Sequence, residues 1–145
     1  MEVKKELLQL LKKQIEVEKT NVEQVSNTEE KIDNTAAKLF LHIIGVDSQK
    51  HAYVLKGIIE MLSKFPPSKN LWEHKLGSYV DPIAVKKELE SHMKREAEMI
   101  AHVEKEIKQA KDEGLKQLLQ LIFEEEKKHH KMLKTVIQNL YKITP

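Results

Sequence analysis

Apolar residues recur at alternating intervals of three and four along four long stretches of the chain. This spacing places the apolar side chains on one face of an α-helix, and it is typical of helices that pack about 20° apart in a bundle. No stretch alternates with period two, so no strands are predicted. The pattern predicts four helices, at about 3–31, 36–64, 82–111 and 115–142.

The segments between these helices predict how the helices are connected. Pro66 and Pro67 end the second helix, whereas Asp81 followed by Pro82 is a typical start for the third. At about 3.3 Å per residue, the intervening segment, 65–81, can span about 55 Å. A thirty-residue helix with a rise of about 1.5 Å per residue is only about 45 Å long. We therefore expect an all-α, four-helix bundle made of two helical hairpins, 3–64 and 82–142, joined by a long crossover.

Each apolar face is interrupted by polar residues only near its middle. These residues are Glu18, Ser48, His51, Glu96, Glu126 and His129. A carboxylate in an apolar core costs several kcal/mol unless it is paired or bound to a cation. Because all four helices carry this costly feature at mid-length, the sequence predicts one shared polar site.

The two halves of the chain match each other at an offset of 78 residues without a gap. The matched polar positions, taken in pairs, are Glu18 with Glu96, Ser48 with Glu126, and His51 with His129. Within the first hairpin, Glu18 and Ser48 lie equally far from the turn, and within the second, Glu96 and Glu126 do. The repeat therefore places the polar residues at the same height along both hairpins.

Composition narrows the possible classes of protein. The chain of 145 residues suits a single domain, and it has no cysteine, which excludes disulfides, thiolate zinc sites and iron–sulfur clusters. A formal net charge of +2 gives no electrostatic case for binding nucleic acid or a membrane surface. No stretch approaches the about 20 apolar residues of a membrane span, and no signal core is visible at the N-terminus. We therefore expect a soluble, cytoplasmic protein.

The motif Glu126-x-x-His129 carries the most specific chemistry. Residues three apart share a helical face, so a carboxylate oxygen and an imidazole nitrogen would point the same way. That pair suits iron, manganese or zinc. Together with the other polar residues, it predicts a metal site formed by Glu18, His51, Glu96, Glu126 and His129. The alternative is a hydrogen-bonded polar layer that fixes the register of the helices.

On these residues and the long crossover, the chain resembles the ferritin-like superfamily, and rubrerythrin-like bundles in particular, over essentially all of its length. The resemblance implies a di-iron or di-manganese centre, with Glu18 and His51 on one metal, Glu96 and His129 on the other, and Glu126 bridging. It also implies a di-metal peroxidase or oxidase acting on dioxygen or peroxide with a reductant that the sequence does not identify, or a role in iron handling. The absence of cysteine excludes the rubredoxin-like domain. We expect a homodimer, and no residue is assigned a catalytic role.

One position departs from the family pattern. Ser48 stands where a second bridging glutamate is expected, and the adjacent Asp47 lies about 100° around the helix. Water or hydroxide could fill the gap, or the site could hold one metal, or none. His92, one turn before Glu96, could add a nitrogen ligand or could be a partly exposed histidine on the helix flank. A second hypothesis is therefore a helical bundle with a degenerate site, which acts as a structural or partner-binding protein.

Overall fold

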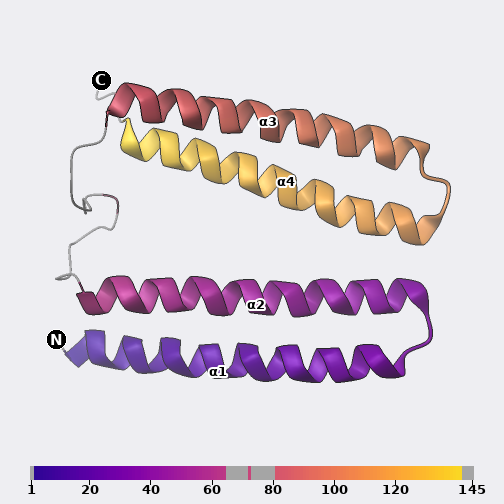
Figure 1. The fold of residues 1–145 in the computed structure, drawn as a ribbon, viewed down its shortest axis with the longest axis horizontal. Helices are drawn as coiled ribbons and strands as arrows, with labels where there is room; N and C mark the ends of the chain where they lie inside the picture. The colour runs from indigo at the N-terminus through magenta and orange to yellow at the C-terminus, as the bar shows by residue number, and fades with distance from the viewer. Residues whose placement is uncertain (1, 65–71, 73–80, 142–145) are drawn as a thin grey trace. The chain divides into compact units, whose positions relative to one another are not determined.

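The computed structural model describes residues 2–64, 72 and 81–141, and these residues form four helices. The helices are α1 (Glu2–Lys31), α2 (Thr35–Lys64), α3 (Pro82–Gln109) and α4 (Glu113–Leu140) (Figure 1). The prediction of four helices is confirmed, and no strand occurs in this part of the chain. Apart from Trp72 and Asp81, the predicted crossover at 65–81 lies outside the described residues.

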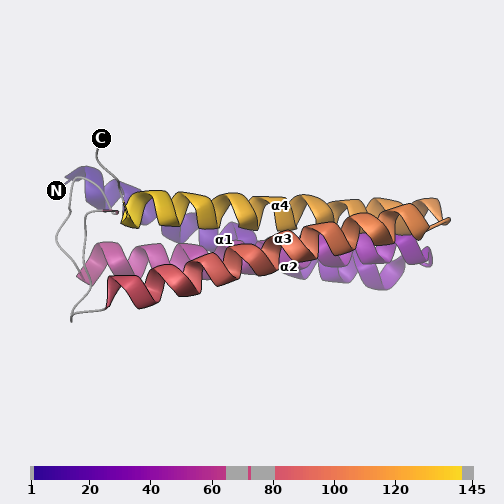
Figure 2. The same cartoon turned by 90° about the horizontal axis from the view of Figure 1, so that it is seen from above.

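The chain divides into two compact units, 1–67 and 68–145, and each unit contains one helical hairpin. Helix α1 packs along α2, and α3 packs along α4. In both views the two helices of a hairpin run alongside each other from the turn to the open end (Figure 1 and Figure 2). The assembly of both hairpins into one ferritin-like bundle and one domain stays a prediction.

Short polar side chains determine where three of the helices begin. Asn34 Oδ1 accepts a hydrogen bond from Ala37 N at 3.0 Å, and Asp81 and Asp112 cap α3 and α4 in the same manner. Such caps satisfy backbone N–H groups that have no partner within the helix. Both turns contain three residues, 32–34 and 110–112, and are 78 residues apart.

Two predicted helix limits near the second turn were wrong by two residues. Helix α3 ends at Gln109 rather than near Lys111, because the backbone of Ala110 is extended, with φ −68° and ψ 132°. Helix α4 begins at Glu113 rather than at Leu115, because Asp112 is its N-cap. Gly114 therefore lies within the first turn of α4 and is not part of the loop.

The first hairpin has a small apolar core at the height of the predicted polar layer. Ile15, Ala52 and Leu55 are buried together, and Leu11 and Ile59 pack against them. Other apolar residues of the predicted seams, such as Ile44 and Ile122, are nearly half exposed. In an isolated hairpin a seam residue contacts only one other helix, so the burial of these residues in a four-helix core stays a prediction. None of the described helices has the length and apolar character required to cross a membrane.

Candidate metal centre

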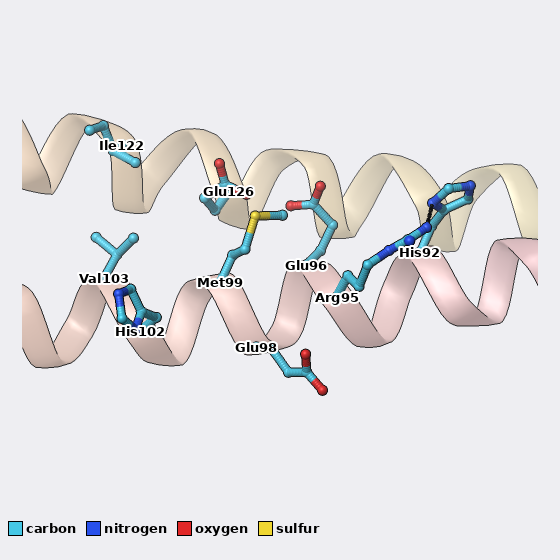
Figure 3. Close-up of a pocket in the computed structure, with 9 residues that line it drawn as sticks. All are labelled: His92, Arg95, Glu96, Glu98, Met99, His102, Val103, Ile122 and Glu126. Atoms are coloured by element: carbon cyan, nitrogen blue, oxygen red, sulfur yellow. Dashed lines mark hydrogen bonds between the residues drawn. The ribbon is translucent and has the colours of Figure 1, made fainter.

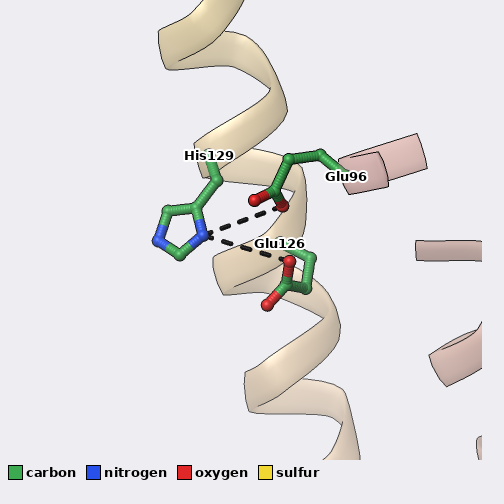
Figure 4. Close-up of side chains that lie close together, drawn as sticks. All are labelled: Glu96, Glu126 and His129. Atoms are coloured by element: carbon green, nitrogen blue, oxygen red, sulfur yellow. Dashed lines mark ion pairs between the residues drawn. The ribbon is translucent and has the colours of Figure 1, made fainter. Parts of the chain in front are cut away.

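Three predicted ligands lie together in the second hairpin. Glu126 and His129 share one face of α4, as their spacing predicts, and Glu96 approaches them from α3 (Figure 4). Glu96 and Glu126 are equally distant from residue 111 in the turn, so the antiparallel hairpin places them at one height. One ligand atom of each residue lies within 4.8 Å of the other two.

The distances from His129 to the two carboxylates are too long for hydrogen bonds but suit a shared cation. His129 Nδ1 lies 3.9 Å from Glu96 Oε2 and 4.0 Å from Glu126 Oε2. Two nitrogen or oxygen ligands that each lie about 2.1 Å from a zinc ion, or from an ion of similar size, are at most about 4.2 Å apart. Small side-chain rotations would therefore bring all three atoms within reach of one ion.

The burial of the two carboxylates provides a test of this fit. The Glu96 and Glu126 side chains are each only 17% exposed. Their Oε2 atoms are buried and have no hydrogen-bond partner among the described residues. A buried carboxylate oxygen without a donor is unfavourable, and a cation between the two oxygens would satisfy both. The donor set therefore fits a metal ion.

Without a metal, a proton can perform part of this role. The pKa of Glu126 is raised above its ordinary value of 4.5, mainly because its protonated carboxyl hydrogen-bonds to Glu96. Burial and the negative charge of Glu96 raise this pKa further, whereas His129 lowers it. A proton shared by the two carboxyls thus competes with a metal for the same oxygens.

The equivalent residues of the first hairpin are bonded directly to each other. His51 Nδ1, on α2, donates to Glu18 Oε2, on α1, at 2.8 Å. Ser48, which is only 4% exposed, accepts a hydrogen bond from Asn21 Nδ2 at 2.9 Å. The structure therefore brings Glu18 and His51 together. That they share one site with the other three ligands stays a prediction.

The sequence pattern did not identify Asn21 as part of the polar layer. Its spacing could have done so, because Asn21 lies three residues after Glu18 and therefore on the same face of α1. At the 78-residue offset its counterpart is Met99, so the repeat breaks at this position. A polar residue that replaces an apolar one next to the predicted layer indicates a hydrogen-bonding partner for that layer.

The two remaining candidate ligands have other partners. Asp47 Oδ1 lies 3.9 Å from Lys50 Nζ on the exposed side of α2. The His92 ring faces Arg95, whose guanidinium donates to Nδ1 of the ring (Figure 3). His92 and Arg95 line a cavity of about 640 Å³ together with Glu96 and Glu126, so His92 lies beside the cluster without joining it.

No family model, curated protein or solved structure matches the chain. The resemblance to ferritin-like proteins therefore stays an expectation. The fold and the site define an all-α protein with a candidate carboxylate–histidine metal centre.

Proposed function

We propose that the protein binds a divalent transition metal through Glu96, Glu126 and His129. The observation that supports this proposal is the pair of buried carboxylate oxygens that have no donor and face one imidazole nitrogen. A polar layer built only for structure would be expected to satisfy its buried atoms with hydrogen bonds.

The donor set limits which metals would bind. Two carboxylates and one imidazole suit iron, manganese and zinc, whereas calcium and magnesium prefer oxygen ligands alone. Iron or manganese bound here would supply one-electron chemistry toward dioxygen or peroxide. The residues of the chain would hold the ion, balance its charge and limit its contact with water.

The resemblance to rubrerythrin-like proteins extends this proposal. It suggests oxygen or peroxide handling, or iron handling, by a cytoplasmic homodimer. In that form the centre would also include Glu18 and His51 and would hold two metals.

Metal titration of matched variants tests the proposal. We expect chelator-treated protein to bind Mn²⁺ or anaerobic Fe²⁺ in calorimetry, and a double variant, Glu126→Gln with His129→Ala, to lose that binding. Glu124→Gln is a suitable control, because Glu124 lies on α4 and accepts its hydrogen bond from Gln120. Equal affinity of the parent and the double variant would refute the assignment.

A second candidate function is a structural or partner-binding bundle without a metal. The observation that favours it is the first hairpin, where the polar residues Glu18, His51, Asn21 and Ser48 all have hydrogen-bond partners within the protein. Elemental analysis of the purified protein distinguishes the two functions, because this candidate predicts no metal that remains after gel filtration.

A further inference from the structure

The two hairpins place different chemistry at equivalent positions. In the first hairpin the layer consists of a carboxylate, a hydroxyl and an imidazole, from Glu18, Ser48 and His51. In the second, Glu126 replaces the hydroxyl with another carboxylate. The counterpart of Asn21 is Met99, whose side chain has no hydrogen-bond donor.

This difference changes the contacts in each layer. With only one carboxylate available, His51 and Glu18 form a hydrogen bond of 2.8 Å, and Asn21 satisfies Ser48. In the second hairpin Nδ1 of the imidazole lies 3.9 and 4.0 Å from two carboxylates, each with a buried oxygen that lacks a donor. The polar side chains of the first layer therefore satisfy one another by hydrogen bonds, whereas two carboxylate oxygens of the second layer have no donor.

The charges lead to the same distinction. In the first hairpin one carboxylate, Glu18, faces one imidazole, His51. In the second hairpin two carboxylates, Glu96 and Glu126, face one imidazole, and a cation between them would offset the repulsion of their like charges. Among the described residues, the cluster of three potential metal ligands lies in the second hairpin.

We propose that this chain holds one metal ion per molecule, bound by α3 and α4, and that the Glu18–His51 pair ties α1 to α2 without metal. This inference rests on the proposed function and differs from the two-metal centre that the family resemblance implies. With three protein ligands, the ion keeps a coordination position for water or a small exogenous ligand.

The 78-residue offset provides matched variants for a test in the full chain. His129→Ala and Glu96→Gln change the proposed metal site, and His51→Ala and Glu18→Gln make the same changes in the first hairpin. Calorimetric titration with Mn²⁺ gives affinity and stoichiometry, and thermal unfolding in chelator gives metal-free stability. Circular dichroism at low temperature establishes that each variant is folded.

We expect one Mn²⁺ per parent chain and at least a tenfold loss of affinity in His129→Ala and Glu96→Gln. His51→Ala and Glu18→Gln should change affinity less than twofold but should lower the melting temperature of the metal-free protein. Two Mn²⁺ per parent chain would overturn the inference, as would an equal loss of affinity in both sets, while leaving the proposed function intact. Unchanged affinity in both sets, or no binding by the parent, would refute the proposed function itself.

A gain of binding provides a test that does not depend on removing ligands. Ser48→Glu gives the first hairpin the same three ligand types as the second, so we expect this variant to bind two Mn²⁺ per chain. Ser48→Gln, which has nearly the same size but no charge, should still bind one. If Ser48→Glu folds and still binds one, the missing carboxylate is not what limits the parent to one metal, and the inference is wrong.

Discussion

Replacing Glu126 with glutamine should stabilise the metal-free protein and remove its stabilisation by metal. In the parent, the largely buried Glu126 and Glu96 face each other, and the pKa of Glu126 is raised above 4.5 because its protonated carboxyl can donate to Glu96 and because it is buried. At neutral pH the pair must either keep both charges or take up a proton. A glutamine amide can donate to Glu96 at any pH and requires neither.

Both costs can be estimated from the structure. The two carboxylate oxygens lie no more than 4.8 Å apart, so two unit charges there repel by at least about 3.5 kcal/mol at an effective dielectric constant of about 20. Protonating a carboxyl that ordinarily titrates at 4.5 costs about 3.4 kcal/mol at pH 7. Solvent at the partly exposed edge and the nearby His129 reduce the penalty. We therefore expect Glu126→Gln to stabilise the metal-free protein by about 1–2 kcal/mol, or about 2–8 °C in melting temperature.

The effect should depend on pH with a definite sign. Because the pKa of Glu126 is higher in the folded state, the folded protein binds more protons than the unfolded chain above pH 4.5. The contribution of this group to stability is therefore complete below pH 4.5 and is lost as pH rises through the raised pKa. The glutamine that replaces Glu126 does not titrate, so the advantage of the variant should be near zero at pH 4 and should grow toward pH 7.

Thermal unfolding followed by circular dichroism from pH 4 to pH 8, with chelator and with Mn²⁺, measures these differences. Glu124→Gln controls for the loss of one negative charge on α4. Glu96, His129 and Glu125 also influence the pKa of Glu126, so the comparison is made at each pH between variant and parent. A metal-free Glu126→Gln protein that melts below the parent at pH 7, or by a constant difference at every pH, would refute the reasoning.

Three further predictions concern the metal and the helices. A hundredfold excess of Mn²⁺ over its dissociation constant should stabilise the protein by about 2.7 kcal/mol, and a melting temperature insensitive to metal would contradict the proposed site. Leu55→Ala should destabilise the first hairpin by about 2–3 kcal/mol in denaturant unfolding because Leu55 is buried, whereas Val54→Ala, at an exposed position, should change stability by less than about 0.5 kcal/mol. Asp112→Ala should cost about 1 kcal/mol because Leu115 N loses its partner, and Asp112→Ser should restore most of that loss.

The helices could be predicted because two independent signals agree. The spacing of apolar residues identified each helix, and Asp81 marked the start of α3, where its side chain accepts from Ile83 N. The end of α3 was less predictable, because neither Ala110 nor Lys111 disfavours a helix. The position of Asp112 as an N-cap ends the turn, and this choice is made by a side-chain hydrogen bond rather than by helix propensity.

The candidate site could be predicted only to the level of backbone height and helical face. The spacing of Glu126 and His129 and the antiparallel hairpin were sufficient to bring Glu96 to them. The hydrogen bond from Asn21 to Ser48 was not foreseen, because spacing does not show which side chain a polar group selects across two helices. That choice depends on rotamers and on the neighbouring donors, which only the structure shows.

Ser48 and Glu126 occupy matched positions of the two hairpins, and the difference between them produces two kinds of polar layer. A serine leaves one carboxylate for one imidazole, and the two form a hydrogen bond of 2.8 Å. A glutamate leaves two carboxylates for one imidazole, so the layer has an excess negative charge that no arrangement of the three side chains removes. Burial makes that excess costly, and only a proton or a cation removes it. Charge balance, more than the positions of the side chains, therefore distinguishes a candidate metal site from a hydrogen-bonded tie.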